Sequence, residues 1–441
     1  MKIKGEGLVR SIGVWGLSAN IVNIIIGAGI FVIPALVAEN MGANSLVAYL
    51  FCGILIALIM LCFAEAGSKV PRSGGGYAYV EEAFGPFPAF LTAIFYLLGG
   101  VLADASVSNA LVDIAAGLFP FLKETLWRII FLFLIFGTLS FINIVGIKQG
   151  IGLVKLLTIG KLIPLLILIC LGWKDVAFSN LAWDGFPTLK QLGETSLLLF
   201  FAFQGGDVGL SVGGEIKKPK KNIPRAIFIG ISGVIVIYML IQTVTQGVLG
   251  NQLQNFQEAP LAETARVVFG PVGFGLLFIG AAISMTGMLS GEILNNPRVL
   301  FAVSKDRVIP TGLFARIHPR FLTPYLAIFF YSLTGFFIAI FGGFKVLVSI
   351  ASACVLLTYL GVSLAVIRLR KIKKSSPKEY TIPGGITVPV LSAIIILYFL
   401  SNLQRYEIIG FVVLLIILSL IFISMKILDK RVRKVKSKRN A

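Results

Sequence analysis

The stretch IIIGAGIF, residues 24–31, places two glycines in the middle of a long apolar segment, and FFAFQGGD, residues 200–207, does the same in a later one. A glycine costs a helix about 1 kcal/mol relative to alanine. The two clusters therefore favour an interruption near the middle of each helix over an unbroken helix. The alternative is close packing between membrane helices through small residues, which is common.

The composition around these stretches excludes a soluble globular protein. Hydrophobic residues make up 57% of the 441 residues and charged residues only 13%, with a mean hydropathy of +0.93. The apolar runs repeatedly reach the roughly 20 residues that a helix needs to cross a bilayer. The ten-residue alternation typical of membrane β-barrels is absent from the sequence. We therefore predict an all-α polytopic membrane protein.

About twelve transmembrane helices are expected from the order of the apolar runs. The short basic stretch before residue 11 leads into a glycine-interrupted span and does not resemble a cleavable signal. The predicted spans are 14–37, 46–67, 87–119, 129–145, 151–173, 195–214, 227–250, 272–294, 325–341, 346–367, 386–403 and 408–427.

The basic residues predict the orientation, because short loops rich in lysine and arginine stay in the cytoplasm. If the amino terminus is inside, the external loops hold seven of the 39 basic residues. The other 32 lie at the termini and on the inner side, and Lys161 is the clear exception. Both termini are then cytoplasmic in a multi-pass protein of the cell membrane, and anionic inner-leaflet lipid accounts for the net charge of +19 without nucleic acid.

The two interrupted spans occupy corresponding places in two halves of the chain. Five spans separate them, so the first runs outward and the sixth inward, as in an inverted five-plus-five repeat, where broken helices mark the binding site of a transporter. The expected organisation is a cytoplasmic amino terminus over 1–12, a first repeat over 13–173, a second repeat over 174–368, two accessory helices over 369–427 and a basic tail over 428–441.

A pair of helix breaks suits a zwitterion. Each break presents unpaired N–H groups on one side and unpaired C=O groups on the other. We expect a substrate carboxylate on the N–H groups of 28–30 and an ammonium group on carbonyls such as those of Ile25, Phe201 and Gln204. The predicted substrate-binding residues are Ile25, Gly27, Ala28, Gly29, Ile30, Phe201, Phe203, Gln204, Gly205 and Glu292.

Ionisable residues near the bilayer centre are functional candidates, because each costs at least about 2.5–3.5 kcal/mol to insert. Asp104, Lys161 and Asp207 are the predicted coupling residues, and Glu292 is expected to face the substrate. The buried amine of Lys161 either titrates during transport or remains a fixed cation. A buried ion pair or a snorkelling lysine is the structural alternative.

Four stretches, in this order, resemble the amino acid, polyamine and organocation transporter superfamily, over nearly the whole chain. They are IIGAGIFVIPA at 25–35, AEAGSKVPRSGGGYAYVEEAFGPFPAFL at 64–91, FFAFQGGDVGLSVGGEIKKPKKNIPRAI at 200–227 and NPRVLFAVSKDRVIP at 296–310.

The resemblance implies a LeuT-like fold of ten core and two accessory helices, with alternating access to a central site. It also implies that Lys161 takes the place that sodium occupies in related carriers. Asp207 departs from the glutamate of many members, and Glu292 stands where several amine antiporters carry an aromatic residue. These two departures leave the substrate open.

The leading functional prediction is a sodium-independent amino acid carrier, working as a proton symporter or an exchanger. A polyamine or cationic amino acid antiporter is the alternative, favoured by the acidic set Asp104, Asp207 and Glu292; an ion channel or a nontransporting receptor is a further one. No cofactor, metal or enzyme activity is expected, because the four cysteines lack metal-ligand spacing and His318 is the only histidine. Protons and membrane lipid are expected partners, and a partner subunit stays open.

Overall fold

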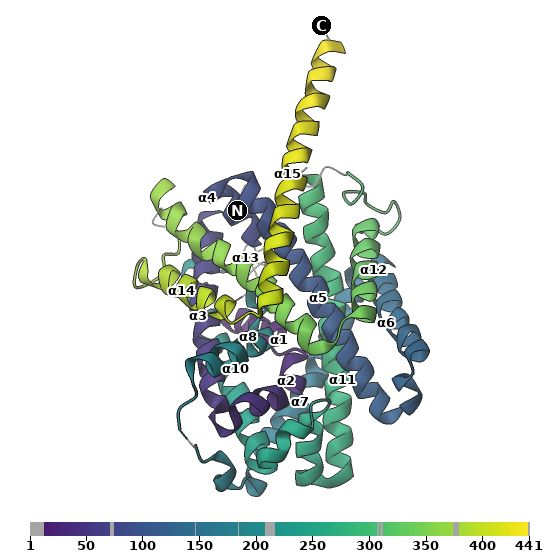
Figure 1. Cartoon of the computed structure of the whole chain (residues 1–441), viewed down its shortest axis with the longest axis vertical. Coiled ribbons are helices and arrows are strands. Elements are labelled where there is room, and N and C mark those ends of the chain that lie inside the picture. Colours follow the sequence, from purple (N-terminus) through teal and green to yellow (C-terminus); the bar gives the residue numbers. More distant parts are fainter. Residues whose placement is uncertain are drawn as a thin grey trace.

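The computed structural model describes residues 13–70, 75–145, 147–183, 185–207, 217–306, 308, 312–373 and 379–439. Side chains are described for these residues except 20, 23, 147–159, 219–220 and 428–439. This part of the chain forms a bundle of long helices (Figure 1), so the predicted all-α membrane fold is confirmed.

Each predicted span corresponds to one helix or to the pieces of a broken one. Seven helical stretches of the described chain are long and apolar enough to cross a membrane. The helices are α1 Val14–Ile25, α2 Gly29–Met41, α3 Ser45–Lys69, α4 Gly75–Phe84, α5 Pro86–Leu118, α6 Thr125–Val145, α7 Ile147–Gly172, α8 Leu189–Phe203, α10 Pro219–Leu249, α11 Pro260–Lys305, α12 Tyr325–Phe341, α13 Phe344–Ile372, α14 Thr387–Ser401 and α15 Arg405–Arg439.

The first predicted span is divided into α1 and α2 at the glycine pair. Helix α1 ends at Ile25, and α2 begins at Gly29 without a side-chain cap. Between them the Gly27 N–H donates to the Ile25 carbonyl at 2.8 Å, a local turn that a helix cannot continue through. The sequence prediction of a broken first span is therefore confirmed.

The sixth span also breaks where its glycines lie. Helix α8 ends at Phe203, Gln204 is extended, and Gly205 has a φ of +97°. That conformation favours glycine, because a side chain there would meet its own backbone. The remainder of the predicted span, 208–214, lies outside the described residues.

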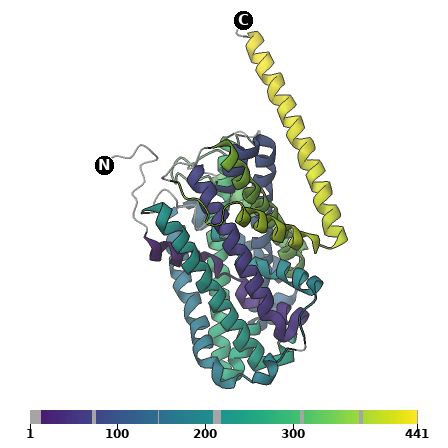
Figure 2. The same cartoon turned by 90° about the vertical axis from the view of Figure 1, so that its left-hand side faces the viewer.

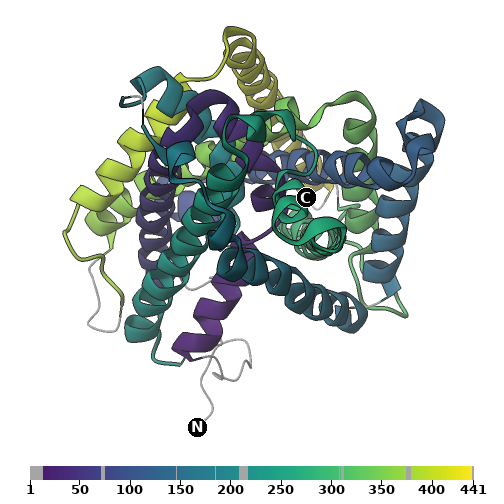
Figure 3. The ribbon, with the colours of Figure 1, turned by 90° about the horizontal axis from the view of Figure 1, so that it is seen from below.

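The long central helices hold the two breaks in place. Helix α5 packs along α13, α11 packs along α7, and α10 packs against α1 and α3. Figure 3 shows these helices from below, with α11 seen nearly along its axis. One large cluster of buried apolar side chains runs through this bundle, including those at both breaks.

Two features lie outside the predicted spans. Helix α4 is a short helix before α5, and it packs against α13 and α5. Helix α11 starts well before its predicted span and bends at Gly270, where φ is +70°. Hydropathy could not reveal either feature, because neither depends on an apolar run.

The end of the molecule predicted to face the cytoplasm is tied together by charged groups. The Arg370 guanidinium donates from two nitrogens to the Glu65 carboxylate, at 2.6 and 2.5 Å, and the Ile382 N–H donates to the same carboxylate at 2.8 Å. Nearby, Lys69 lies 3.4 Å from Glu379. Figure 1 places α4 and the end of α13 at this end of the bundle. Glu65 is thus a structural residue that fixes the loop before α14.

Helix α15 stands apart from the rest of the bundle. It extends well beyond the other helices in Figures 1 and 2, and the apolar side chains along its first 23 residues are mostly exposed. Its contacts with α5 include aromatic pairs, with ring centroids of Phe422 and Phe87 5.2 Å apart and those of Phe411 and Phe95 6.3 Å apart. An exposed apolar face of this length is suited to lipid.

Candidate substrate site

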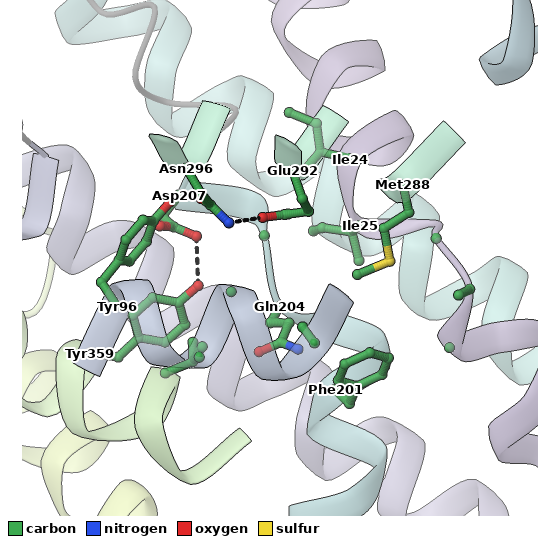
Figure 4. Close-up of a pocket in the computed structure, with 18 residues that line it drawn as sticks. Ile24, Ile25, Tyr96, Phe201, Gln204, Asp207, Met288, Glu292, Asn296 and Tyr359 are labelled. Atoms are coloured by element: carbon green, nitrogen blue, oxygen red, sulfur yellow. Dashed lines mark hydrogen bonds between the residues drawn. The ribbon is translucent and has the colours of Figure 1, made fainter. Parts of the chain in front are cut away.

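Both helix breaks open onto one central cavity of about 50 Å³. Figure 4 shows that its labelled residues come from several different helices and point towards one another. The lining residues are Ile24, Ile25, Gly27, Ala28, Gly29, Tyr96, Gly99, Gly100, Ala103, Phe201, Gln204, Gly205, Asp207, Met288, Glu292, Asn296, Val355 and Tyr359.

The first break contributes backbone to this cavity. The N–H groups at the start of α2 have no acceptor within their own helix, and the positive end of the helix dipole points the same way. Gly27 and Gly29 leave this backbone uncovered. The carbonyl of Gly27 faces α11, where it accepts a hydrogen bond from the Ser284 hydroxyl at 3.0 Å. The first break can therefore receive an anionic group through backbone alone.

The second break contributes the negative end of a helix dipole and two polar side chains. The last carbonyls of α8 lack partners within their helix, and Phe201 and Gln204 line the cavity. Asp207 lies beyond the break, where its carboxylate accepts a hydrogen bond from the Tyr359 hydroxyl at 2.6 Å. Figure 4 shows this bond at one side of the cavity. A positive group is favoured here by both the dipole and the carboxylate.

The two breaks touch each other directly. A Cβ atom added to Gly29 would lie 2.7 Å from both the Cα and the Cβ of Ala202. Behind this contact, the buried hydroxyl of Tyr238 lies 2.8 Å from the Ala202 carbonyl and 3.0 Å from the Ile25 carbonyl. Tyr238 thus holds the end of α1 and the end of α8 at a fixed separation.

Glu292 reaches the cavity from α11, opposite Asp207 in Figure 4. Its carboxylate accepts a hydrogen bond from the amide of Asn296, which lies one turn further along the same helix. Met288 lies one turn before it, so α11 presents three successive turns to the cavity. This spacing could have identified Asn296 and Met288 from the sequence, because positions four apart share one helix face.

Most of the predicted substrate-binding residues meet at the cavity, but some do not line it. Ile30 is fully buried behind the first break. Phe203 points away from the cavity, with its ring 5.0 Å from that of Tyr238. The predicted residues that line the cavity are Ile25, Gly27, Ala28, Gly29, Phe201, Gln204, Gly205, Asp207 and Glu292.

Two of the predicted coupling residues also lie outside the lining. Asp104 is fully buried and accepts a hydrogen bond from the Tyr331 hydroxyl at 2.9 Å. Lys161 is buried within α7. Its neighbour Gly160 packs against Ile283, which directly precedes the Ser284 that binds the first break. Lys161 therefore lies on a helix that supports the site from behind.

Tyr96 and Tyr359 line the cavity and were not predicted from the sequence. Both lie within long apolar helices, where a tyrosine carries no local signal that distinguishes a binding role from packing. Their place at the site follows from the way α5 and α13 cross.

A second cavity, of about 180 Å³, lies outside the central one. Val32 and Leu36, one and two turns along α2 from the first break, line it together with Phe344. The ring of Phe344 contacts that of Phe201 edge-on, with centroids 6.3 Å apart. This aromatic pair lies between the two cavities.

Comparison with known proteins connects this geometry to a family. A family model described as amino acid permease matches residues 12–425. The serine/threonine exchanger SteT of Bacillus subtilis is 30% identical over 89% of this chain and 90% of its own length. The methylthioribose transporter of the same bacterium is 26% identical, over 95% of this chain and 94% of its own.

A solved structure shows the same fold. The outward-open, substrate-bound structure of a Na⁺-coupled sialic acid symporter superposes with a TM-score of 0.58 at 10% identity, covering 88% of this chain and 89% of its own. The predicted LeuT-like architecture is thereby confirmed. The relatives are carriers rather than enzymes, as predicted. This chain belongs to the amino acid permease family, within the amino acid, polyamine and organocation transporter superfamily.

Proposed function

We propose that this permease is a sodium-independent secondary carrier that exchanges amino acids across the cytoplasmic membrane. The observation that carries the proposal is the meeting of two oppositely polarised helix breaks at one cavity. The carboxylate of the substrate binds the N–H groups that begin α2, and the ammonium group of the substrate binds the carbonyls that end α8. Exchange is favoured over proton symport by the similarity to a serine/threonine exchanger.

The size of the cavity supports alternating access. A cavity of about 50 Å³ has room for only a few waters, whereas ligand sites typically occupy several hundred Å³. Substrate therefore enters only when the breaks or their neighbours move. Separation of the Phe201 ring from the Phe344 ring would join the central cavity to the second cavity.

Lys161 supports independence from sodium. Its buried amine lies on α7, which packs along α11 behind the first break. A cation carried by the chain supplies a positive charge where a sodium-dependent carrier would need a bound ion. Asp207 is the second coupling candidate, since it lines the cavity itself.

Purified protein in proteoliposomes tests the proposal through uptake of labelled serine, threonine and leucine. Uptake should be the same in sodium and in choline, and amino acid inside the vesicles should accelerate it. A requirement for sodium would contradict the coupling scheme. An absence of acceleration together with uptake driven by a pH gradient would replace exchange by proton symport.

Lys161→Ala and Lys161→Arg separate a charge requirement from a structural one. The alanine variant should lose most uptake, while the arginine variant should keep binding because it keeps the cation. An alanine variant with wild-type uptake would show that Lys161 is structural only.

A cationic amino acid or polyamine antiporter is the second candidate, because Asp207 and Glu292 both bring carboxylates to the cavity. Competition with an amino acid methyl ester and with a decarboxylated analogue distinguishes the two. Strong inhibition by both compounds would favour the polyamine antiporter. Loss of inhibition when the carboxylate is removed would favour a carrier that recognises the zwitterionic amino acid.

A further inference from the structure

A continuous hydrogen-bond path leads from the substrate cavity into the bundle and ends at Asp104. Its members are Glu292 and Asn296 on α11, Tyr331 on α12 and Asp104 on α5. Only the first two line the cavity. The path therefore joins the carboxylate that faces the substrate to one that does not.

The direction of each bond follows from the donors available. The Asn296 amide nitrogen donates one hydrogen to Glu292 and the other to the Tyr331 hydroxyl oxygen, which lies 2.8 Å away. Both amide hydrogens are then used. The single Tyr331 hydrogen is left to donate to Asp104 at 2.9 Å. Asn296 is the residue that donates in both directions. Its orientation depends on Asp104, because Asp104 accepts the Tyr331 hydrogen and so leaves the Tyr331 oxygen to accept from Asn296.

The path is tightly enclosed. Asp104 is fully buried, and Asn296 and Tyr331 are 1% and 2% exposed. A Cβ atom added to Gly100, one turn before Asp104, would collide with the Asn296 amide and lie 2.9 Å from the Tyr331 hydroxyl. There is consequently little room for these side chains to adopt another arrangement.

The charges along the path are of one sign. Within the described part of the chain, the path joins Asp104 to one other carboxylate, that of Glu292, and Tyr331 is the hydrogen-bonding neighbour of Asp104. Asp207 and Tyr96 face Glu292 across the cavity. The second carboxyl oxygen of Asp104 has no hydrogen-bond partner among the described residues. Two carboxylates joined by a buried path to which no lysine or arginine of the described residues is bonded are not both ionised, because their repulsion and desolvation add.

We propose that Asp104 is a positioning residue that stays protonated and, through Tyr331 and Asn296, holds Glu292 as the ionised group facing the substrate. Of the two carboxyl groups, Glu292 is the one that reaches the cavity, where water or a positive substrate group stabilises its charge. Asp104 acts as a neutral acceptor that completes the path. The effect of Asp104 on substrate choice rests on the proposed function, whereas the protonation of Asp104 does not.

The first test compares two substitutions at Asp104. Asp104→Asn keeps a neutral acceptor for Tyr331 and should keep the wild-type ranking of competing neutral and cationic amino acids. Asp104→Leu removes the acceptor, so the Asn296 amide is no longer held towards Glu292. The ratio of the KM values for the two classes should then change about tenfold, the effect of losing the Asn296 hydrogen bond to the ionised Glu292. Tyr331→Phe should match Asp104→Leu.

Dependence on Glu292 separates positioning from general damage. In a Glu292→Gln background, Asp104→Leu should cause no further change in the ranking, because the group it positions is already neutral. Asp113→Asn is the matched control, since Asp113 lies on the same helix but pairs with Arg128 at 2.5 Å, away from the path. An Asp104→Asn variant whose ranking changes like that of Asp104→Leu would overturn the proposal, because Asp104 would then be needed as a charge.

Infrared spectroscopy of the purified protein tests the proton without any transport assay. The carbonyl band of a protonated carboxyl group should be present at neutral pH, disappear in Asp104→Asn and shift in Tyr331→Phe. It should be unchanged in Asp113→Asn. A spectrum without an Asp104-dependent band overturns the inference even if amino acid exchange is observed. A carrier that shows the band but takes up no amino acid contradicts the proposed function and leaves the protonated Asp104 standing.

Discussion

The two helix breaks face one cavity but are built differently. The first consists of glycine, alanine and isoleucine, and offers only backbone dipoles. The second adds Gln204 and Asp207, and Asp207 is in turn bound by Tyr359. A backbone dipole cannot titrate or turn away, whereas a carboxylate can do both. The difference suggests that the first break recognises what all amino acids share, and that the second, with Glu292, responds to charge.

Gly29→Val should have the largest effect, because it forces the two breaks apart. The added carbon would lie 2.7 Å from the backbone of Ala202, which cannot yield as a flexible side chain can. We expect no measurable substrate binding by the purified protein in a scintillation proximity assay. Gly137→Val is the matched control, since no atom of the described residues lies within 4 Å of a Cβ there. Wild-type binding by Gly29→Val would disprove the close contact between the breaks.

Asp207→Asn should lower the affinity for substrate about tenfold. The change removes a charge from the second break and weakens a hydrogen bond to a charged group, which is worth about 1.5–3 kcal/mol. Tyr359→Phe should weaken binding less, because it leaves the carboxylate in place. Competition binding at several salt concentrations measures both. Equal affinities for wild type and Asp207→Asn would mean that the second break, like the first, acts through backbone alone.

Tyr238→Phe should have a moderate effect that involves both breaks. It leaves the Ile25 and Ala202 carbonyls without their shared hydroxyl donor, at a cost of about 1 kcal/mol or more. We expect a lower thermal midpoint in detergent and an affinity several-fold weaker. Tyr398→Phe is the comparison, since it removes a hydroxyl that donates to the Leu189 carbonyl at the other end of α8. A variant with lower stability but unchanged affinity would show that Tyr238 serves the fold and not the site.

Gly27→Ala should have the smallest effect. Its Cβ would meet the Met288 sulfur at 3.1 Å, and a methionine end can shift by a few tenths of an ångström. The protein should fold normally, and the affinity should fall only a few-fold as the methyl group enters the cavity. Met288→Ala in the same background should restore part of the loss, as measured by equilibrium binding. A loss as severe as that of Gly29→Val would place both glycines in the same packing role.

Features with a local cause were predictable from the sequence. The glycines break the first and sixth spans where they occur, and apolar length predicts the helices. Which side of a helix faces the cavity is not local. Ile30 and Phe203 lie next to true lining residues but point into the packed core. Asp104 depends on Tyr331, 227 positions away, so its place behind the site required the folded arrangement. The transport roles assigned to the site residues stay predictions.

The length of helix α15 also indicates how deep in a membrane the central cavity lies. Its apolar part, Arg405–Ile427, is about 34 Å long at 1.5 Å per residue, close to the roughly 30 Å of a hydrocarbon core. Phe422, near the carboxyl-terminal end of that part, contacts Phe87 at the start of α5, so a hydrocarbon core that covers this part of α15 has one surface near Pro86. Measured along α5, the lining residues Tyr96 and Gly100 then lie about 15 and about 21 Å below that surface. A molecule bound at that depth reaches water only through the protein.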